Sequence, residues 1–174
     1  GEDFLLAAFE IRNWNQELSP WEAPPVWGTE AFGNGAAETL DFILRDLLPE
    51  LKRRFSLSSK LPVILGGYSL AGLFSLWAAY QADVFSGIAA VSPSVWFPGW
   101  MEYALSQPIQ TGRIYLSLGD KEERTKNQTM KTVGDNIRKL YQHYSAPDSV
   151  LSCTEELHHP QPEEQPSTQH FLLS

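Results

Sequence analysis

The sequence has a single cysteine, no long apolar run and no excess of basic residues. Cys153 has no second cysteine with which to form an internal disulfide, which fits a reducing compartment. No stretch of about 18 apolar residues is present, so the sequence predicts no membrane span. The 13 Lys and Arg residues against 21 Asp and Glu residues give a net charge of −8. This charge argues against nucleic acid or an anionic membrane as a partner.

Targeting, phosphate-binding and metal-binding signals are also missing. The segment 1–15 lacks a basic region and a small-residue cleavage site, so we expect no signal peptide and a cytoplasmic location. There is no glycine-rich phosphate loop and no cluster of metal ligands, so we expect no cofactor and no metal. The tripeptide 127–129 matches the N-glycosylation pattern, but we discount it in a chain without an export signal.

The sequence does contain a regular alternation of strand-like and helix-like segments. Apolar runs typical of buried strands occur at 4–11, 62–67, 86–94, 113–120 and 149–155, and apolar residues at helical spacing occur at 36–55, 70–81, 97–107 and 126–144. This alternation predicts an α/β fold, with a mostly parallel sheet of about five strands and helices on both faces. We place one domain at 1–156 and expect a disordered tail at 157–174, which is rich in Pro, Gln and Glu.

One serine stands between a predicted buried strand and a predicted helix, in the segment GGYSLAG at 66–72. In a parallel sheet, ligands bind at the carboxyl ends of the strands, where Ser69 would lie. Gly67 and Ala71 have almost no side chain, so they leave room for a strained turn that projects the Ser69 hydroxyl. The N–H of Leu70 would point toward an oxyanion. The pattern predicts a serine nucleophile; the alternative is a tight turn that happens to contain a serine.

A serine nucleophile needs a base and an acid that orients the base. The acid should follow the fourth predicted strand, where Asp120, Glu122 and Glu123 lie; we select Glu122, with Asp120 as the alternative. The base should follow the last predicted strand, where His158 and His159 lie, and we select His159. The alternative for the two histidines is a disordered pair, because the segment lacks the glycine-containing turn that normally holds a catalytic imidazole.

Aromatic residues are concentrated in the predicted loops. Trp14, Trp21, Trp27, Trp96 and Trp100 all lie in or beside loops. Loop tryptophans often line an apolar pocket, so we predict that Trp14, Trp96 and Phe97 bind the substrate. The alternative is that these rings seal an edge of the core.

Four segments, in this order, resemble a group of uncharacterised bacterial α/β-hydrolases: NWNQELSPWEAPPVWG, GGYSLAGLFSLWAAYQADVF, SPSVWFPGW and YLSLGDKEERTKN. The group is similar to a compact branch of the esterase superfamily, related to esterase D and the siderophore esterases. The resemblance covers about residues 3–154. It implies an α/β-hydrolase fold, Ser69 as the nucleophile, and carboxylic esters or thioesters as substrates.

Two features depart from that group. Its members usually end the last strand in a Gly-Asn-His-like turn and a closing helix, whereas this sequence has EELHHPQPEEQ, so the resemblance does not assign the histidine. Members also have an earlier strand, whose loop supplies a second oxyanion donor. The chain therefore looks truncated at its N-terminus and atypical at its C-terminus, and we expect an unfilled slot between its first two strands.

Three functional interpretations remain. The first is a serine acyl hydrolase that acts on a small ester-type substrate through an acyl-enzyme at Ser69. The second is a catalytically impaired α/β-hydrolase domain that binds a ligand or partner without turnover. The third is an assembly module whose open slot is filled by another chain, giving a homo-oligomer.

Overall fold

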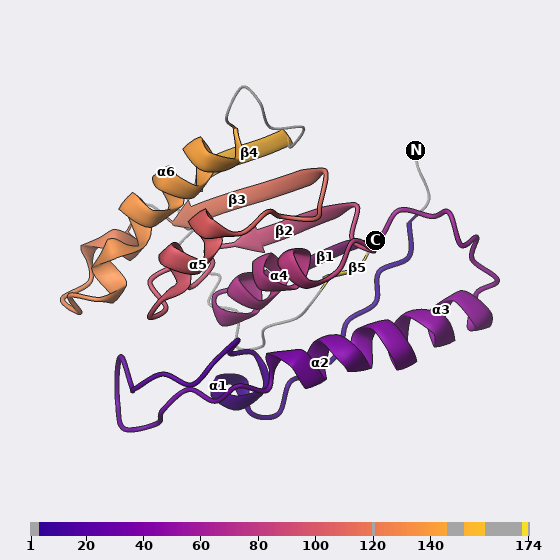
Figure 1. The fold of residues 1–174 in the computed structure, drawn as a ribbon, viewed down its shortest axis with the longest axis horizontal. Coiled ribbons are helices and arrows are strands. Elements are labelled where there is room, and N and C mark those ends of the chain that lie inside the picture. Colours follow the sequence, from indigo (N-terminus) through magenta and orange to yellow (C-terminus); the bar gives the residue numbers. More distant parts are fainter. Residues whose placement is uncertain (1–3, 120, 146–151, 159–171, 174) are drawn as a thin grey trace.

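A five-stranded sheet forms the centre of the protein, as shown in Figure 1. The computed structural model describes residues 4–119, 121–145, 152–158 and 172–173, with side chains for the first two of these segments. The strand order is β4-β3-β2-β1-β5, with β1 (Ile64–Tyr68), β2 (Gly87–Val91), β3 (Arg113–Gly119), β4 (Ser152–His158) and β5 (Leu172–Leu173). The first four strands are parallel and β5 is antiparallel to β1. The predicted fold class, an α/β fold with a mostly parallel sheet, is confirmed.

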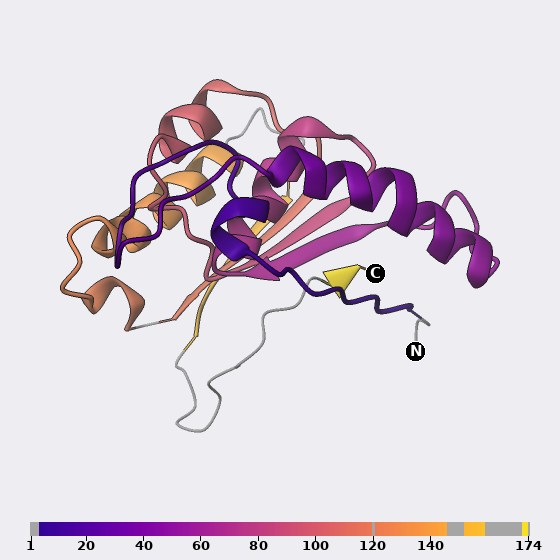
Figure 2. The same cartoon turned by 90° about the horizontal axis from the view of Figure 1, so that it is seen from below.

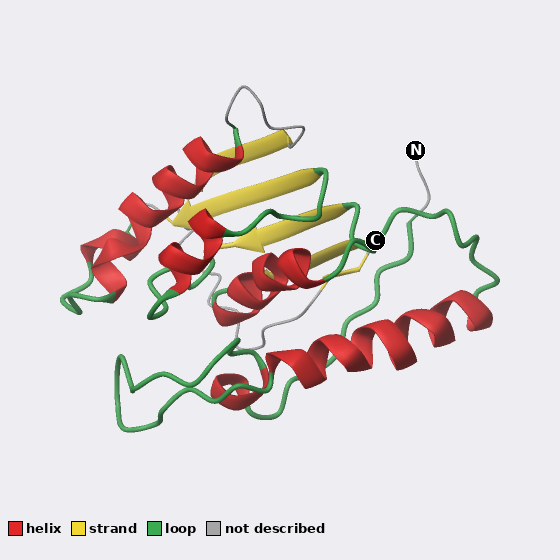
Figure 3. Cartoon of the chain, in the orientation of Figure 1, coloured by secondary structure: helices red, strands yellow, loops and turns green. Residues whose placement is uncertain are grey.

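Apart from the short helix α1, the helices lie close to the segments where the apolar periodicity predicts them (Figure 3). They are α1 (Trp14–Glu17), α2 (Ala36–Phe42), α3 (Leu48–Arg54), α4 (Leu70–Gln81), α5 (Trp100–Ser106) and α6 (Val133–Tyr144), with short 3-10 turns at η2 (Glu122–Arg124) and η3 (Met130–Thr132). A π-helical turn, η1 (Ile43–Leu47), joins α2 to α3 without a break. Pro49 explains this widened turn, because its ring would meet the carbonyl of Arg45 in a regular helix. No described helix is both long and apolar enough to cross a membrane.

The helices of the described residues gather on one face of the sheet, whereas the sequence predicts helices on both (Figure 2). The reason is the direction of winding. Successive connections run from β1 to β2, then to β3 and then to β4, so each new strand is added on the same side of the previous one. Because parallel crossovers are right-handed, each step in that direction places its helix on the same face. Helices on the other face would require strands that wind in the opposite direction from β1.

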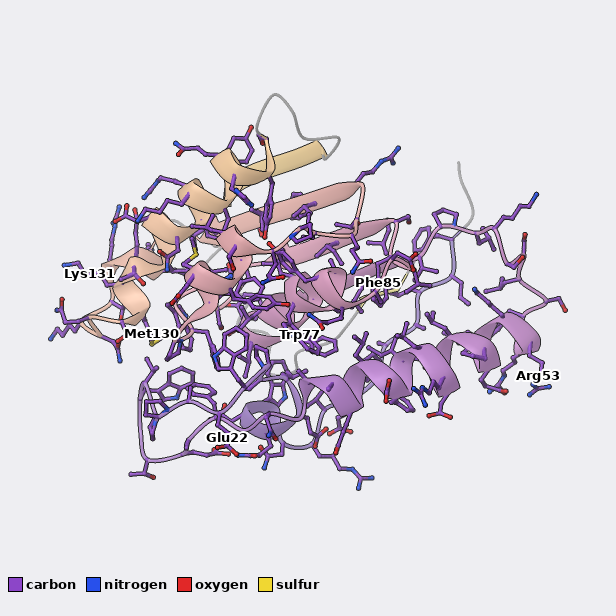
Figure 4. All side chains as sticks on the ribbon, in the orientation of Figure 1. Glu22, Arg53, Trp77, Phe85, Met130 and Lys131 are labelled. Carbon is purple, nitrogen blue, oxygen red and sulfur yellow. The ribbon has the colours of Figure 1, made fainter. Side chains whose placement is uncertain are left out.

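Burial along the strands follows this one-sided arrangement. The side chains that face the helices are almost completely buried: Leu65, Ile88, Ala90, Ile114, Leu116 and Leu118. On the opposite face, Ile64 and Tyr68 are each 36% exposed. Figure 4 shows the same contrast at the scale of the molecule, with Trp77 and Phe85 in the interior and Arg53 and Lys131 extending outward.

The two ends of the chain differ from the sequence prediction. The segment 4–11 is not a strand, because the outer edge of β1 is paired with β5 at Leu65↔Leu173 and Gly66↔Leu172. The expected slot beside β1 is therefore partly occupied from within the chain. The segment 157–174, predicted as a tail, contributes the end of β4 and all of β5 to the sheet. A paired edge is favourable because a bare strand edge leaves backbone N–H and C=O groups without partners.

Adjacent residues on β1 test the assignment of the two faces. Leu65→Ala removes a side chain with 0% exposure and should lower the free energy of unfolding by about 2–5 kcal/mol. Ile64→Ala, on the opposite face, should cost about 1 kcal/mol or less, because its side chain is already partly in water. Urea denaturation of both variants gives the comparison. Equal costs would contradict the one-sided core.

Candidate active site

Ser69 occupies the turn between β1 and α4 in a strained backbone conformation. Its φ of 57° and ψ of −120° lie in a region that a residue with a side chain rarely adopts. Backbone hydrogen bonds hold the turn through both the N–H and the carbonyl group of Ser69. The Ser69 N–H donates to the carbonyl of Val91 at 3.0 Å, and the Ser69 carbonyl accepts from the N–H groups of Leu73 at 3.1 Å and Ser94 at 3.0 Å. The surrounding backbone thus fixes the strained conformation from β2 and from the first turn of α4.

Small residues around Ser69 allow this close approach. A Cβ atom at Gly67 would lie 2.6 Å from the backbone carbonyl carbon and oxygen of Ala71. A Cβ atom at Gly72 would lie 3.0 Å from the Gly67 carbonyl oxygen and 3.1 Å from the Cα of Pro93. The strand, the helix and the loop that follows β2 therefore meet at contact distance directly beside Ser69.

The loop after β2 contains two serines that the sequence analysis did not select. The Ser94 Oγ lies 3.2 Å from the Ser69 Oγ, and the Ser92 Oγ donates a hydrogen bond to Glu122 Oε1 at 2.5 Å. Both serines are buried. The sequence predicts a strand over 86–94, whereas β2 ends at Val91, so both serines lie in the loop. Their position directly after β2 could have identified them as site residues, because the carboxyl ends of the strands, where Ser69 also lies, are the usual place for a ligand.

Glu122 lies in the first turn after β3, with its carboxyl group turned toward Ser92. Its Oε1 also accepts the N–H of Gly119 at 3.1 Å. Burial raises the pKa of Glu122, and these two hydrogen bonds oppose that effect. Burial, and then the charge of Glu122, raise the pKa of Tyr68. Among the hydrogen bonds of the described residues, none uses Glu122 Oε2, which leaves this oxygen available.

The other two candidate acids are placed differently. Glu123 forms an ion pair with Arg138 on α6, with 3.1 Å between Oε2 and Nη2. Its carboxylate is therefore satisfied near the surface. Asp120 lies outside the described residues. Of the Glu122 and Glu123 carboxylates, that of Glu122 bonds to the loop that contains Ser94, and that of Glu123 is paired with α6.

The selected histidine, His159, also lies outside the described residues. The backbone of its neighbour His158 ends β4 and pairs with Gly119 of β3. His143 is exposed on α6, where its ring contacts Tyr144. The described residues contain no imidazole bonded to Ser69 or Glu122. They also contain no group of three His, Cys, Asp or Glu side chains that could hold a metal ion.

The N–H of Leu70, the predicted oxyanion donor, lies at the amino end of α4, directly after Ser69. Leu70 begins α4, so its N–H has no acceptor within the helix. The positive end of the helix dipole lies at the same point, where negative charge is favoured. The Leu70 side chain itself is buried, so only the backbone of this residue is offered to the site.

The three predicted substrate-binding rings are largely used in packing. Trp96 and Phe97 are buried, and Trp14 packs on the core from α1. The ring exposed beside them is that of Trp27, which is 49% exposed and lies edge-on to Trp96, with 5.3 Å between ring centroids. Asn127 Nδ2 donates to the carbonyl of Val26 at 2.7 Å, which ties the Trp27 loop to the segment after Glu122. Trp27 is one of the loop tryptophans of the sequence, but it is not among the three residues predicted to bind the substrate.

A large cavity lies at the other end of the sheet, at the amino ends of the strands. It has a volume of about 1390 Å³ and is lined by the amino ends of the strands, including Ile64, Gly87 and Arg113, and by Leu51 and Phe55 of the α3 region. A large apolar cavity is the usual first candidate for a ligand site. We favour the Ser69 edge instead, because ligands of parallel sheets bind at the carboxyl ends of the strands and the polar groups converge there.

Three solved structures share this fold. The siderophore hydrolase EstA from Aspergillus nidulans is 24% identical, with a TM-score of 0.67 over 84% of this chain and 59% of its own. The siderophore hydrolase EstB from the same organism is 22% identical, with a TM-score of 0.64 over 85% and 58%. The BES protein from Bacillus cereus is 17% identical, with a TM-score of 0.61 over 88% and 58%. The chain thus spans less than two thirds of each of these structures.

No curated protein matches the sequence. A family model, however, covers most of the chain. The model described as "Putative esterase" matches residues 11–146. The matched region runs from the loop before α1 to the end of α6, and it includes Ser69, the Ser92–Ser94 loop and Glu122. The chain therefore belongs to the family described as "Putative esterase".

Proposed function

We propose that this chain is a serine acyl hydrolase that cleaves carboxylic esters or thioesters through an acyl-enzyme at Ser69. The observation that carries the proposal is the conformation of Ser69. A strained turn at the carboxyl end of a parallel strand presents a hydroxyl group beside an unpaired helix N–H. Strain of this kind costs about 1–3 kcal/mol and persists where it serves a site. The match to an esterase family supports the same reaction class.

Each group has a role in the proposed reaction. The Ser69 Oγ attacks the carbonyl carbon of the substrate while His159 accepts the hydroxyl proton, and the Leu70 N–H binds the oxyanion. His159 then gives the proton to the departing alcohol or thiol, which leaves the acyl group on Ser69. Water attacks this ester with His159 again as the base, and the acid product is released. Glu122 Oε2 accepts the other imidazole N–H and keeps the ring oriented.

The strand register supports His159 as the base. His158 pairs with Gly119, and the N–H of Gly119 donates to Glu122. β4 therefore ends at the carboxyl ends of the strands, where the Glu122 carboxyl also lies, and His159 is the next residue in the sequence.

Aromatic residues beside the site favour a substrate with an apolar or planar part. Trp27 presents an exposed ring over Trp96, and Trp96 follows Ser94 by two residues. Such a ring binds flat or apolar groups by stacking and by exclusion of water. Two of the structural neighbours are named siderophore hydrolases, so siderophores are the first compounds to screen beside simple aryl and alkyl esters.

A fluorophosphonate probe tests the nucleophile directly. We expect covalent labelling at Ser69, because the probe reacts with serines that are activated by a base and an oxyanion site. Mass spectrometry of the labelled peptide identifies the residue, and the Ser69→Ala variant should not react. A folded sample that takes up no label would overturn the acyl-hydrolase proposal and favour the catalytically impaired domain.

The strain at Ser69 should be measurable as stability. Ser69→Gly and Ser69→Ala both remove the hydroxyl, but only glycine adopts a positive φ without steric cost. We expect Ser69→Gly to be more stable than Ser69→Ala by about 1 kcal/mol, since relief of strain exceeds the entropy cost of glycine. Urea denaturation of the two variants measures the difference. An alanine variant of equal or greater stability would show that the turn is not strained.

Glu122 should lower stability at neutral pH. Its pKa is raised in the folded state, so the folded protein holds the proton more tightly than the unfolded chain. The contribution of Glu122 to stability is then fully present below the unfolded pKa and is lost as the pH rises through the folded pKa. Glu122→Gln keeps an oxygen that accepts from Ser92 and Gly119 but carries no charge.

We therefore expect Glu122→Gln to be more stable than the wild type at pH 7 and close to it near pH 4. Denaturation curves at the two pH values, with Glu123→Gln as the matched control, test this. The same variant should lose most esterase activity, because a neutral amide does not stabilise the imidazolium. A Glu122→Gln variant that is less stable at pH 7 than at pH 4, relative to the wild type, would contradict the burial argument.

A further inference from the structure

We infer that the Ser94 hydroxyl donates a hydrogen bond to the Ser69 Oγ and thereby lowers the pKa of the side chain at position 69. The inference deepens the proposed function and depends on it in one respect, that Ser69 is the nucleophile. The two oxygens lie 3.2 Å apart, and the Ser94 N–H also donates to the Ser69 carbonyl at 3.0 Å. Two hydrogen bonds therefore join Ser94 to the same residue.

The direction of the hydroxyl hydrogen bond follows from what each oxygen must do. In the reaction the Ser69 proton leaves toward the base, so its oxygen keeps lone pairs free to accept. The Ser94 side chain is buried, with 2% of the residue exposed. Among the described residues, the Ser69 Oγ is the hydrogen-bond partner found for the Ser94 Oγ. Burial thus keeps water away from the Ser94 hydroxyl, and its proton is directed to Ser69.

A purely local role for this serine does not fit the contacts. Serines in turns usually bond to backbone groups a few residues away. The Ser94 hydroxyl instead reaches a side chain 25 residues away, and the Ser92 hydroxyl reaches Glu122, 30 residues away. One short turn therefore supplies a hydroxyl to each of the two predicted catalytic side chains. The buried ring of Pro93 stiffens the turn between them.

The chemical consequence is a change in acidity. A hydrogen bond donated to an oxygen or sulfur that becomes negative stabilises its deprotonated form and lowers its pKa. As the Ser69 proton passes to the base, negative charge grows on the Ser69 Oγ, and the Ser94 donor is already in place. Ser94 is therefore an activating donor to the reacting atom, in addition to the base and the oxyanion donor.

The test measures acidity without a substrate. Ser69→Cys places a thiol at this position, and the pH dependence of its alkylation by iodoacetamide gives its pKa. Peptide mass spectrometry separates this thiol from that of Cys153. We expect the double variant Ser69→Cys/Ser94→Ala to have a thiol pKa higher by about one unit than Ser69→Cys alone. An unchanged pKa in the double variant would overturn the inference.

Three further variants separate hydrogen bonding from packing. Ser75 is also buried on α4, but its hydroxyl donates to the carbonyl of Ala71, so Ser75→Ala should leave the thiol pKa unchanged. Ser94→Thr keeps the hydroxyl and should keep the low pKa; a rise like that of Ser94→Ala would assign the effect to packing and overturn the inference. If Ser94→Ala does not fold, Ser94→Cys replaces it, because a thiol is a weak donor and should also raise the pKa.

The thiol pKa measurement tests the role of Ser94 separately from the proposed acyl-hydrolase function. The thiol pKa needs neither His159 nor a substrate, so it reports on Ser94 even in a protein that takes up no fluorophosphonate. In a protein that does react, Ser94→Ala should slow labelling of Ser69 about tenfold and move its pH profile upward, whereas Ser75→Ala should do neither. Equal labelling rates and equal pH profiles for the wild type and Ser94→Ala would contradict the inference.

Discussion

The handedness of the parallel crossovers determines the layout of the whole molecule. Four parallel strands follow one another in sequence across the sheet, and each right-handed connection places its helix on the same face (Figure 2). Because the four strands are parallel, their carboxyl ends all lie at the same end of the sheet. Ser69 follows β1, Ser92 and Ser94 follow β2, Glu122 follows β3, and His158 ends β4. The residues of the candidate site therefore follow successive strands, and the order of these strands in the sheet brings them together.

A sheet with one covered face has consequences for the core. Helix α4 is buried along its whole length from Leu70 to Tyr80, because it lies between the sheet and the neighbouring helices (Figure 1). This explains why its sequence is apolar on every side, whereas α6 has one buried stripe and an outer polar face. The opposite face of the sheet keeps Ile64 and Tyr68 partly exposed, and the cavity of about 1390 Å³ opens beside the amino end of β1. The cavity and the candidate site thus lie at opposite ends of the same strands.

The sequence predicts those parts of the protein that local patterns determine. The helical stripe over 36–55, the buried helix at 70–81 and the small residues around Ser69 all act within a few positions of one another. The strand at 4–11 was predicted wrongly because an apolar run does not show which edge is free, and β5 occupies the edge of β1. Glu122 was selected from its position after the predicted strand, but the ion pair that engages Glu123 could not be predicted locally, because Arg138 lies on α6. Ser92 and Ser94 were missed because their partners lie far away in the sequence.

Backbone strain is concentrated where these distant contacts meet. Among the described residues, Ser56, Ser69 and Ser92 are the non-glycine residues with a positive φ. Ser56 follows the end of α3, where a left-handed residue commonly closes a helix. Ser69 and Ser92 have no such local reason: each directly follows a strand, and the last residues of those strands, Tyr68 and Val91, are paired. Both strained serines are bonded to side chains of the candidate site, Ser69 to Ser94 and Ser92 to Glu122. Two strained serines and a half-buried carboxyl group therefore occur together at the carboxyl ends of the strands, which is the pattern expected when function rather than stability selects the residues there.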